Sequence, residues 1–140
     1  MRFLLSFFLV LTATSAMEPL DIKLTCDDLL RFSHTEIHAS KGQEINLELE
    51  NVGKIPALKH NFVLLKPGIN IVSFGNAAQK AAARDFIPAD QEDKIIAHTR
   101  LIASGERDQI TFTLEESGTY AFICSYPGHQ AVSRGVIVVK

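Results

Sequence analysis

Apolar and polar residues alternate over short stretches along most of this chain. The clearest stretch is 44–50, in which Ile45, Leu47 and Leu49 fall on one side of an extended backbone. Segment 110–114 alternates in the same way. The strands predicted from these and from shorter apolar runs are 20–24, 44–50, 61–65, 95–97, 109–114, 119–124 and 135–139. Several are separated by turns that contain glycine, so the pattern predicts an all-β domain, an antiparallel β-sandwich.

The pattern changes between Ile69 and Phe86. Segment 76–85 is rich in residues with high helix propensity, and Pro88 follows shortly after it. We therefore expect one helix here, packed against the outside of the sandwich. The chain shows no internal repeat, low-complexity segment or linker, which indicates a single domain.

Residues 1–16 have the features of a secretory signal peptide. Arg2 supplies the positive end, 3–11 the apolar core, and Thr14-Ser15-Ala16 a small-residue cleavage site. The alternative is a membrane anchor, but so short an apolar run cannot span a bilayer, which takes about 20 residues. We expect removal of 1–16 and a periplasmic domain made of 17–140, which has the size of one ordinary domain.

Charge and motifs narrow the function further. With Arg2 removed, 13 basic residues face 16 acidic ones, a formal charge of −3. There is no basic cluster for nucleic acid or anionic lipid, and no other segment is apolar enough to make this an integral membrane protein. The chain also lacks a Ser-His-Asp signature, a phosphate-binding loop and an HEXXH motif. We therefore expect no nucleic-acid partner and no enzymatic activity.

The stretch 120–129 carries the most informative chemistry. An apolar run ends at Cys124, the chain turns at Pro127-Gly128, and His129 follows. A rigid turn lets the thiolate and the imidazole reach one metal ion with little loss of chain entropy. A soft thiolate with imidazole suits copper or zinc, and two imidazoles with one thiolate are typical of electron-transfer copper. His60, within 58–62, is the best candidate for the second imidazole.

Three blocks of the sequence resemble the cupredoxins, and most closely the azurins. These blocks are 60–64, 95–108 and 118–129, the last continuing through Arg134-Gly135. The cysteine–turn–histidine block is shared by many cupredoxins, whereas the middle block is more specific to azurins. The resemblance implies a cupredoxin-type Greek-key β-sandwich with one helix outside it. It also implies a single copper ion that alternates between Cu(I) and Cu(II), with the ligands His60, Cys124 and His129.

The resemblance further implies roles for residues around the metal. The main-chain N–H groups of Asn61 and Tyr126 would donate hydrogen bonds to the cysteine sulfur and favour the reduced ion. An apolar patch around the C-terminal histidine would dock redox partners briefly. Its members would be Leu58, Pro127, Gly128, Ala131 and Val132.

Two positions depart from the azurin pattern. The weak axial methionine is replaced by Ser133, and no methionine occurs after Met17. The glycine that precedes the first histidine in azurins is Lys59 here, in a segment that is shorter than usual. A water, the Ser133 hydroxyl or a main-chain oxygen such as the Lys59 carbonyl are the candidates for a weak axial contact. A hard oxygen would favour Cu(II) or admit zinc, whereas an empty position would favour Cu(I).

The remaining cysteine and histidines are not expected to bind the metal. Two cysteines in an exported protein favour a disulfide, but a Cys26–Cys124 bridge would consume the proposed ligand, so we expect both to be free. Dimerisation through Cys26 is the alternative to a monomer. His34 and His38 share a face of an extended strand but would stand about 13 Å apart. His98 corresponds to a surface histidine of azurins.

We interpret Asp27-Asp28 and Glu115-Glu116 as solvated turns and not as acid–base groups. The leading hypothesis is an exported mononuclear type 1 copper protein that carries single electrons between soluble or membrane-bound redox proteins. The alternative is a protein that binds and delivers copper, and a metal-free domain is the third reading. An oxidase or nitrite reductase would need further domains and histidine clusters, which this chain lacks.

Overall fold

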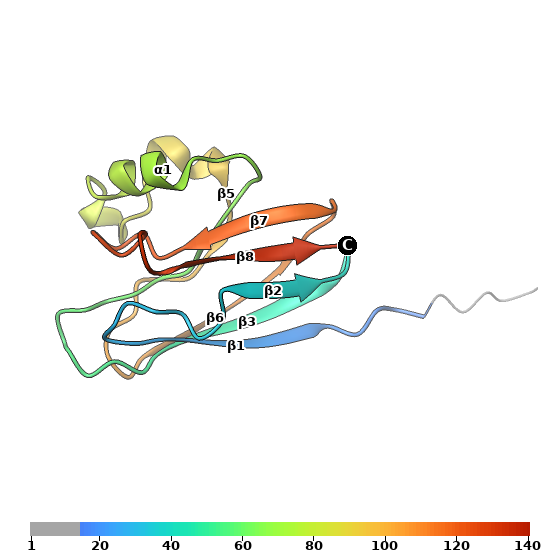
Figure 1. Cartoon of the computed structure of the whole chain (residues 1–140), viewed down its shortest axis with the longest axis horizontal. Coiled ribbons are helices and arrows are strands. Elements are labelled where there is room, and N and C mark those ends of the chain that lie inside the picture. The colour runs from blue at the N-terminus through green and yellow to red at the C-terminus, as the bar shows by residue number, and fades with distance from the viewer. Residues whose placement is uncertain (1–14) are drawn as a thin grey trace, which may run out of the picture.

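The computed structural model describes residues 15–140, so the predicted signal peptide lies, apart from its last two residues, outside the described residues. Two sheets face each other across the core (Figure 1). The three-stranded sheet has the order β1–β3–β6, with β1 at Leu20–Cys26, β3 at Glu44–Asn51 and β6 at Arg107–Thr113. The five-stranded sheet has the order β2–β8–β7–β4–β5. Its strands are β2 (Glu36–Ala39), β4 (Val63–Leu65), β5 (Ile95–His98), β7 (Gly118–Ile123) and β8 (Arg134–Val139).

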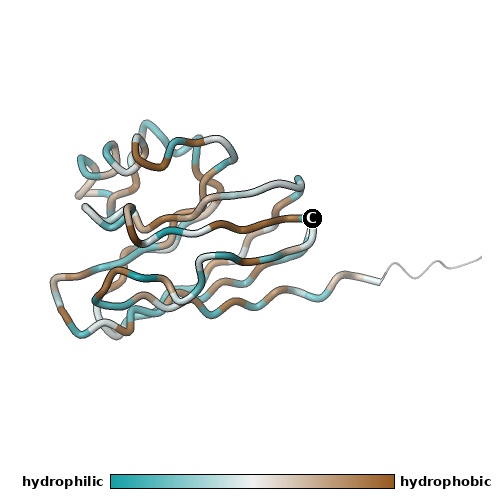
Figure 2. Tube along the Cα trace, viewed as in Figure 1, coloured by the Kyte–Doolittle hydropathy of each residue, from teal (hydrophilic) through white to brown (hydrophobic). Residues whose placement is uncertain are grey.

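The alternating pattern of the sequence places one side of each strand in the core. In β3, Ile45, Leu47 and Leu49 are all fully buried, while the residues between them reach toward solvent. Figure 2 shows this as apolar and polar positions that succeed each other along the strands. The predicted all-β sandwich is therefore confirmed.

Strand direction differs from the prediction, because the sandwich is mixed and not antiparallel. Strand β1 runs parallel to β3, and β2 runs parallel to β8. Alternation reports which face of a strand is buried but says nothing about the direction of its neighbour. Strand β2 was not predicted. Only Ile37 among its four residues is buried, so the sequence shows no repeated alternation there.

The expected helix exists but begins earlier than predicted. Helix α1 spans Ile71–Ala78, and Asn70 caps it by accepting a hydrogen bond from the Ser73 N–H at 2.9 Å. It lies outside the five-stranded sheet (Figure 1), where Phe74 and Ala78 pack on Val63, Leu65 and Ile123.

The alanine-rich segment that follows forms no regular helix. It contains the short 3-10 helix η1 (Ala82–Arg84), and η2 (Ala89–Lys94) comes after Pro88. High helix propensity favoured 76–85 in the sequence, but its small side chains offer little apolar surface to bury, and packing decides the outcome. Within the described part of the chain, no helix is long and apolar enough to cross a membrane.

Candidate metal centre

Two neighbouring strands of the five-stranded sheet bring the candidate ligands together. Strand β4 pairs antiparallel with β7, with Leu64 opposite Phe122, and both side chains lie in the core between the sheets. Because side chains alternate along a strand, Cys124 faces the same way as Phe122. His60 precedes Leu64 by two such steps and also reaches the inner side. The pairing of β4 with β7 thus directs a thiol and an imidazole toward each other.

The His60 main chain is held by a short antiparallel pairing with Ile102. Its N–H donates to the Ile102 carbonyl at 3.0 Å, and the Ile102 N–H donates to the His60 carbonyl at 2.8 Å. The residues that precede His60 form the loop 52–59, which contains no strand.

The loop with the other two candidates closes on itself. At its base, the Cys124 N–H donates to the Ser133 carbonyl at 2.9 Å, and the Ser133 N–H donates to the His129 carbonyl at 2.7 Å. Within it, the His129 N–H donates to the Tyr126 carbonyl at 3.0 Å. Gly128 has a φ of 80°, a left-handed conformation that favours glycine at this turn. The turn therefore holds the imidazole beside the thiol.

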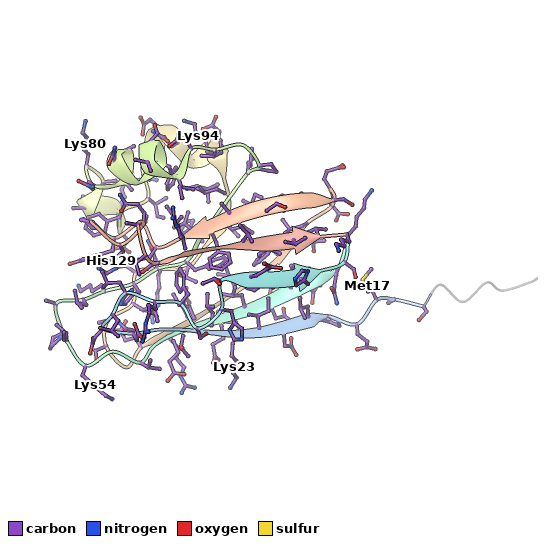
Figure 3. All side chains as sticks on the ribbon, viewed as in Figure 1. Met17, Lys23, Lys54, Lys80, Lys94 and His129 are labelled. Atoms are coloured by element: carbon purple, nitrogen blue, oxygen red, sulfur yellow. The ribbon has the colours of Figure 1, made fainter. Side chains whose placement is uncertain are left out.

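The three candidate side chains converge in a buried space. One donor atom from each of His60, Cys124 and His129 lies within 4.8 Å of the other two, and residues 15–140 hold no other group of this kind. Cys124 Sγ lies 3.5 Å from His129 Nδ1, and the two imidazole ring centres are 4.9 Å apart. Figure 3 shows His129 at the end of the sandwich away from Met17.

The unmet hydrogen-bonding capacity of these side chains fits a bound metal ion. Neither ring nitrogen of His60 has a hydrogen-bond partner, although the side chain is fully buried. Buried polar atoms without partners are rare in native proteins. Two imidazoles and one thiolate are also the donor set of a mononuclear electron-transfer copper site. A copper ion would give the orphaned nitrogen of His60 its partner.

Burial sets the charge of the three groups in the metal-free protein. Burial, and then the charge of His60, lower the pKa of His129 to about 4. Burial also lowers the pKa of His60, opposed by the negative charges of Asp27 and Asp28. Burial raises the pKa of the Cys124 thiol to about 11. At neutral pH both imidazoles are therefore free to bind a metal, whereas the thiol must lose a proton on binding.

The low pKa of His129 predicts that the metal-free protein loses stability in mild acid. The unfolded chain takes up a proton near the ordinary pKa of 6.5, but the folded chain does so only near 4. Between these values the unfolded state binds more protons, so the free energy of unfolding falls as the pH falls, by on the order of 2 kcal/mol. Urea unfolding of the metal-free protein at several pH values would measure this.

A His129→Gln variant should lose much of that slope, because the titrating group is gone. His98→Gln serves as the matched control, since His98 is exposed and lies outside the cluster. An identical pH slope in the wild type and in His129→Gln would contradict the assignment.

The other histidines lie apart from this centre. His34 is exposed and contacts the Ser33 hydroxyl, and His38 is exposed and pairs with Glu36 at 2.7 Å. His98 is exposed as well, with its Nδ1 2.9 Å from a main-chain carbonyl.

The second cysteine is buried and free. Cys26 lies at the end of β1, and its thiol faces the Glu50 carbonyl at 3.5 Å. Burial, and then the neighbouring Cys124, raise the pKa of this thiol. The prediction of two free cysteines is confirmed.

The turn predicted at Asp27-Asp28 also makes a contact that the sequence did not reveal. The Asp28 carboxylate accepts hydrogen bonds from the N–H groups of Lys54 at 2.8 Å and Ile55 at 3.1 Å. Both carboxylates also act on His60. Aspartates often accept main-chain N–H groups in loops, but such a tendency does not reveal which distant loop will be held.

The comparison with known families agrees with this geometry. Residues 20–140 match the family of copper binding proteins described as the plastocyanin/azurin family. The chain belongs to this family. It is 32% identical to azurin from Alcaligenes faecalis over 123 residues, which cover 84% of this chain and 95% of that protein. It is 36% identical to auracyanin-A from Chloroflexus aurantiacus over 115 residues, covering 79% of this chain and 68% of that protein.

Solved structures of cupredoxins share the fold. The structure of auracyanin A, described as a "blue" copper protein from Chloroflexus aurantiacus, superimposes with a TM-score of 0.79 at 32% identity, over 88% of this chain and 100% of that one. The chain is therefore a blue copper cupredoxin with a His-Cys-His site. Its cofactor is one copper ion, with which the arrangement of His60, Cys124 and His129 is consistent. The family consists of non-enzymatic proteins, as the sequence predicted.

Proposed function

We propose that this cupredoxin carries single electrons between redox proteins and transforms no substrate. The observation that carries this proposal is the buried cluster of two imidazoles and one thiol, in which the His60 ring nitrogens have no partner in the protein. When bound there, a copper ion would supply a one-electron change between Cu(I) and Cu(II).

Rigidity of the proposed ligands supports fast transfer. The His129 ring packs against the rings of Tyr126 at 4.8 Å and His60 at 4.9 Å. The His60 main chain is paired with Ile102, and Cys124 is paired with Ser133. Ligands that are held before the metal binds need little movement when its charge changes.

The surroundings of the sulfur favour the reduced ion. The main-chain N–H groups of Asn61 and Tyr126 act on the Cys124 sulfur and lower the pKa of the thiol against the effect of burial. Such donors withdraw electron density from the sulfur. The Asn61 side chain accepts from the Ser125 N–H at 2.8 Å and donates to the Ser125 hydroxyl at 2.8 Å. It thereby ties the His60 segment to the loop that follows Cys124.

For the weak axial contact we propose the main-chain carbonyl of Lys59 or the hydroxyl of Ser133. Ser133 is fully buried, and its hydroxyl donates to the Leu30 carbonyl. That hydrogen bond uses the proton of the hydroxyl and leaves an oxygen lone pair for a weak contact. A change of axial donor mainly alters the reduction potential and the colour of a site of this type.

The docking surface that we propose surrounds His129 at the end of the sandwich. Its exposed members are Pro127, Gly128, Ala131 and Val132, and Leu58 is half-buried beside them. A small apolar surface of this kind suits short-lived contacts with soluble or membrane-bound redox proteins. The protein would act as a monomer in the periplasm after removal of residues 1–16.

Copper titration and voltammetry test the proposal. Adding Cu(II) to the metal-free protein should produce an intense thiolate-to-copper absorption band with one ion per chain, and voltammetry should show a reversible one-electron wave. Tight Cu(I) binding without reversible cycling would instead support the alternative, a protein that delivers copper. Absence of both the band and copper binding would contradict either function.

A further inference from the structure

Side chains from several parts of the chain hold the loop 52–59, which leads into His60. The loop contains no strand, and its main chain is held by hydrogen bonds from the Val52 N–H to the Cys26 carbonyl at 3.0 Å and from the Leu58 N–H to the Ile55 carbonyl at 3.1 Å. The other polar main-chain groups of the loop need partners wherever they are removed from water. Four side chains supply such partners, and two of them belong to segments that border the metal centre.

The first half of the loop is held by Asp28. Its carboxylate accepts from the Lys54 N–H at 2.8 Å and from the Ile55 N–H at 3.1 Å. The fit is close, because a Cβ atom added to Gly53 would lie 2.4 Å from a carboxylate oxygen of Asp28. Charged acceptors form the stronger class of hydrogen bond, so this carboxylate is a firm attachment.

The second half of the loop is held by Tyr126. Its hydroxyl donates to the Ala57 carbonyl at 3.1 Å. Tyr126 belongs to the loop that runs from Cys124 to His129, and its ring packs against His129. One hydrogen bond therefore joins the segment that carries the first imidazole to the segment that carries the other two donors.

Two further residues fasten the base of the loop. The Asn51 side chain donates to the Leu58 carbonyl at 3.1 Å and accepts from the Gly53 N–H at 3.0 Å, and the Ser104 hydroxyl donates to the Gly53 carbonyl at 2.5 Å. These contacts secure the start of the loop and the approach to Lys59. They do not touch the loop that carries Cys124 and His129.

We propose that Asp28 and Tyr126 are positioning residues that clamp the loop 52–59 from two sides and so fix His60 relative to Cys124 and His129. The inference rests on the proposed copper site. The His60 main chain pairs with Ile102, and the Asn61 side chain ties the residue after His60 to Ser125. The preceding loop is the restraint on the other side of His60, so it limits how far the imidazole moves toward or away from the other donors. Loosening the clamp should weaken copper binding and broaden the range of site geometries.

Tyr126→Phe removes one hydroxyl and nothing else. We expect the Cu(I) affinity, measured by competition with a chromogenic chelator, to fall about tenfold, at the lower end of the effect of partners around metal ligands. The Cu(II) electron paramagnetic resonance spectrum should broaden. Tyr120→Phe is the matched control, because the Tyr120 hydroxyl also donates to a carbonyl, that of Glu116 at 2.6 Å, at the other end of β7. It should leave both readouts unchanged.

Asp28 is tested with two variants, since its charge and its hydrogen bonds are separate contributions. Asp28→Ala should lower the Cu(I) affinity about tenfold, while Asp28→Asn should lose less because one acceptor oxygen remains. Asp28→Asn should also raise the reduction potential, since a nearby negative charge favours Cu(II). Asp21→Asn removes the same charge on β1, where Asp21 accepts from the Asn46 side chain, and should change neither readout.

The double variant Asp28→Ala/Tyr126→Phe decides whether the two residues hold one loop. If they do, the loss of affinity should differ from the product of the two single losses, because contacts with a shared partner are not additive. Thermal unfolding of the metal-free variants would confirm that each is folded. Wild-type affinity and spectrum in both single variants would overturn the clamp while the copper site stands, whereas a wild type without a copper band would overturn the proposed function itself.

Discussion

Replacing Cys124 with serine should abolish the intense visible absorption of the copper-loaded protein. The band requires a thiolate bound to copper, and a serine hydroxyl is a hard donor that stays protonated at neutral pH. The loss of affinity should exceed the 10- to 100-fold that is typical of residues around a metal ligand, because a ligand itself is removed. Absorption spectroscopy during a copper titration, with competition by a chelator, measures both effects.

The other cysteine offers a control within the same chain. Cys26 is equally buried, but it faces the Glu50 carbonyl and stands outside the group of three donors. Cys26→Ser retains a donor for that carbonyl and should keep the visible band at full intensity. A band that survives Cys124→Ser, or that disappears in Cys26→Ser, would contradict the proposed ligand set.

The second large effect is expected from Gly135→Ala, which should destabilise the fold. A Cβ atom at this position in β8 would lie 2.3 Å from the Phe122 ring and 2.6 Å from the Thr35 carbonyl oxygen. Phe122 cannot move aside easily, because its ring packs against those of Phe32 and Phe62. Overpacking of this kind costs about 3 kcal/mol, and the midpoint of thermal unfolding should fall by roughly 10 °C.

Circular dichroism of the metal-free variants would measure that midpoint. Gly68→Ala is a useful comparison, because Gly68 has a φ of 80° but no atom within 4 Å of an added Cβ. It should cost only the 1–2 kcal/mol or so of a left-handed conformation. Equal losses in the two variants would show that packing against Phe122 and Thr35 is not the cause.

Much of the molecule could be predicted because its signals are local. Alternation in 44–50 predicted buried Ile45, Leu47 and Leu49, and all three are fully buried. The short apolar segment at Val63–Leu65 was a strand candidate, and both of its faces are covered, one by the core and one by α1. The turn between Cys124 and His129 was evident because its chemistry is confined to a few residues.

What the sequence did not reveal depends on contacts between distant segments. Strands β1 and β3 pair in parallel, but the alternation of apolar residues is the same in parallel and antiparallel strands, so it does not reveal the direction of pairing. The start of α1 was set by the Asn70 cap and by the burial of Phe74, which outweighed the helix propensity of the alanines that follow. The contact between Asp28 and the loop 52–59 could not be predicted, because the two segments lie far apart in the sequence.

The closure of the ligand loop by the Cys124–Ser133 hydrogen bond has a consequence for folding. The loop is complete only when β8, the final strand of the described chain, has docked beside β7. A chain in which β8 has not yet docked would present the first imidazole without the other two donors held beside it. We therefore expect the three donors to be ready for a metal only after the whole sandwich has formed.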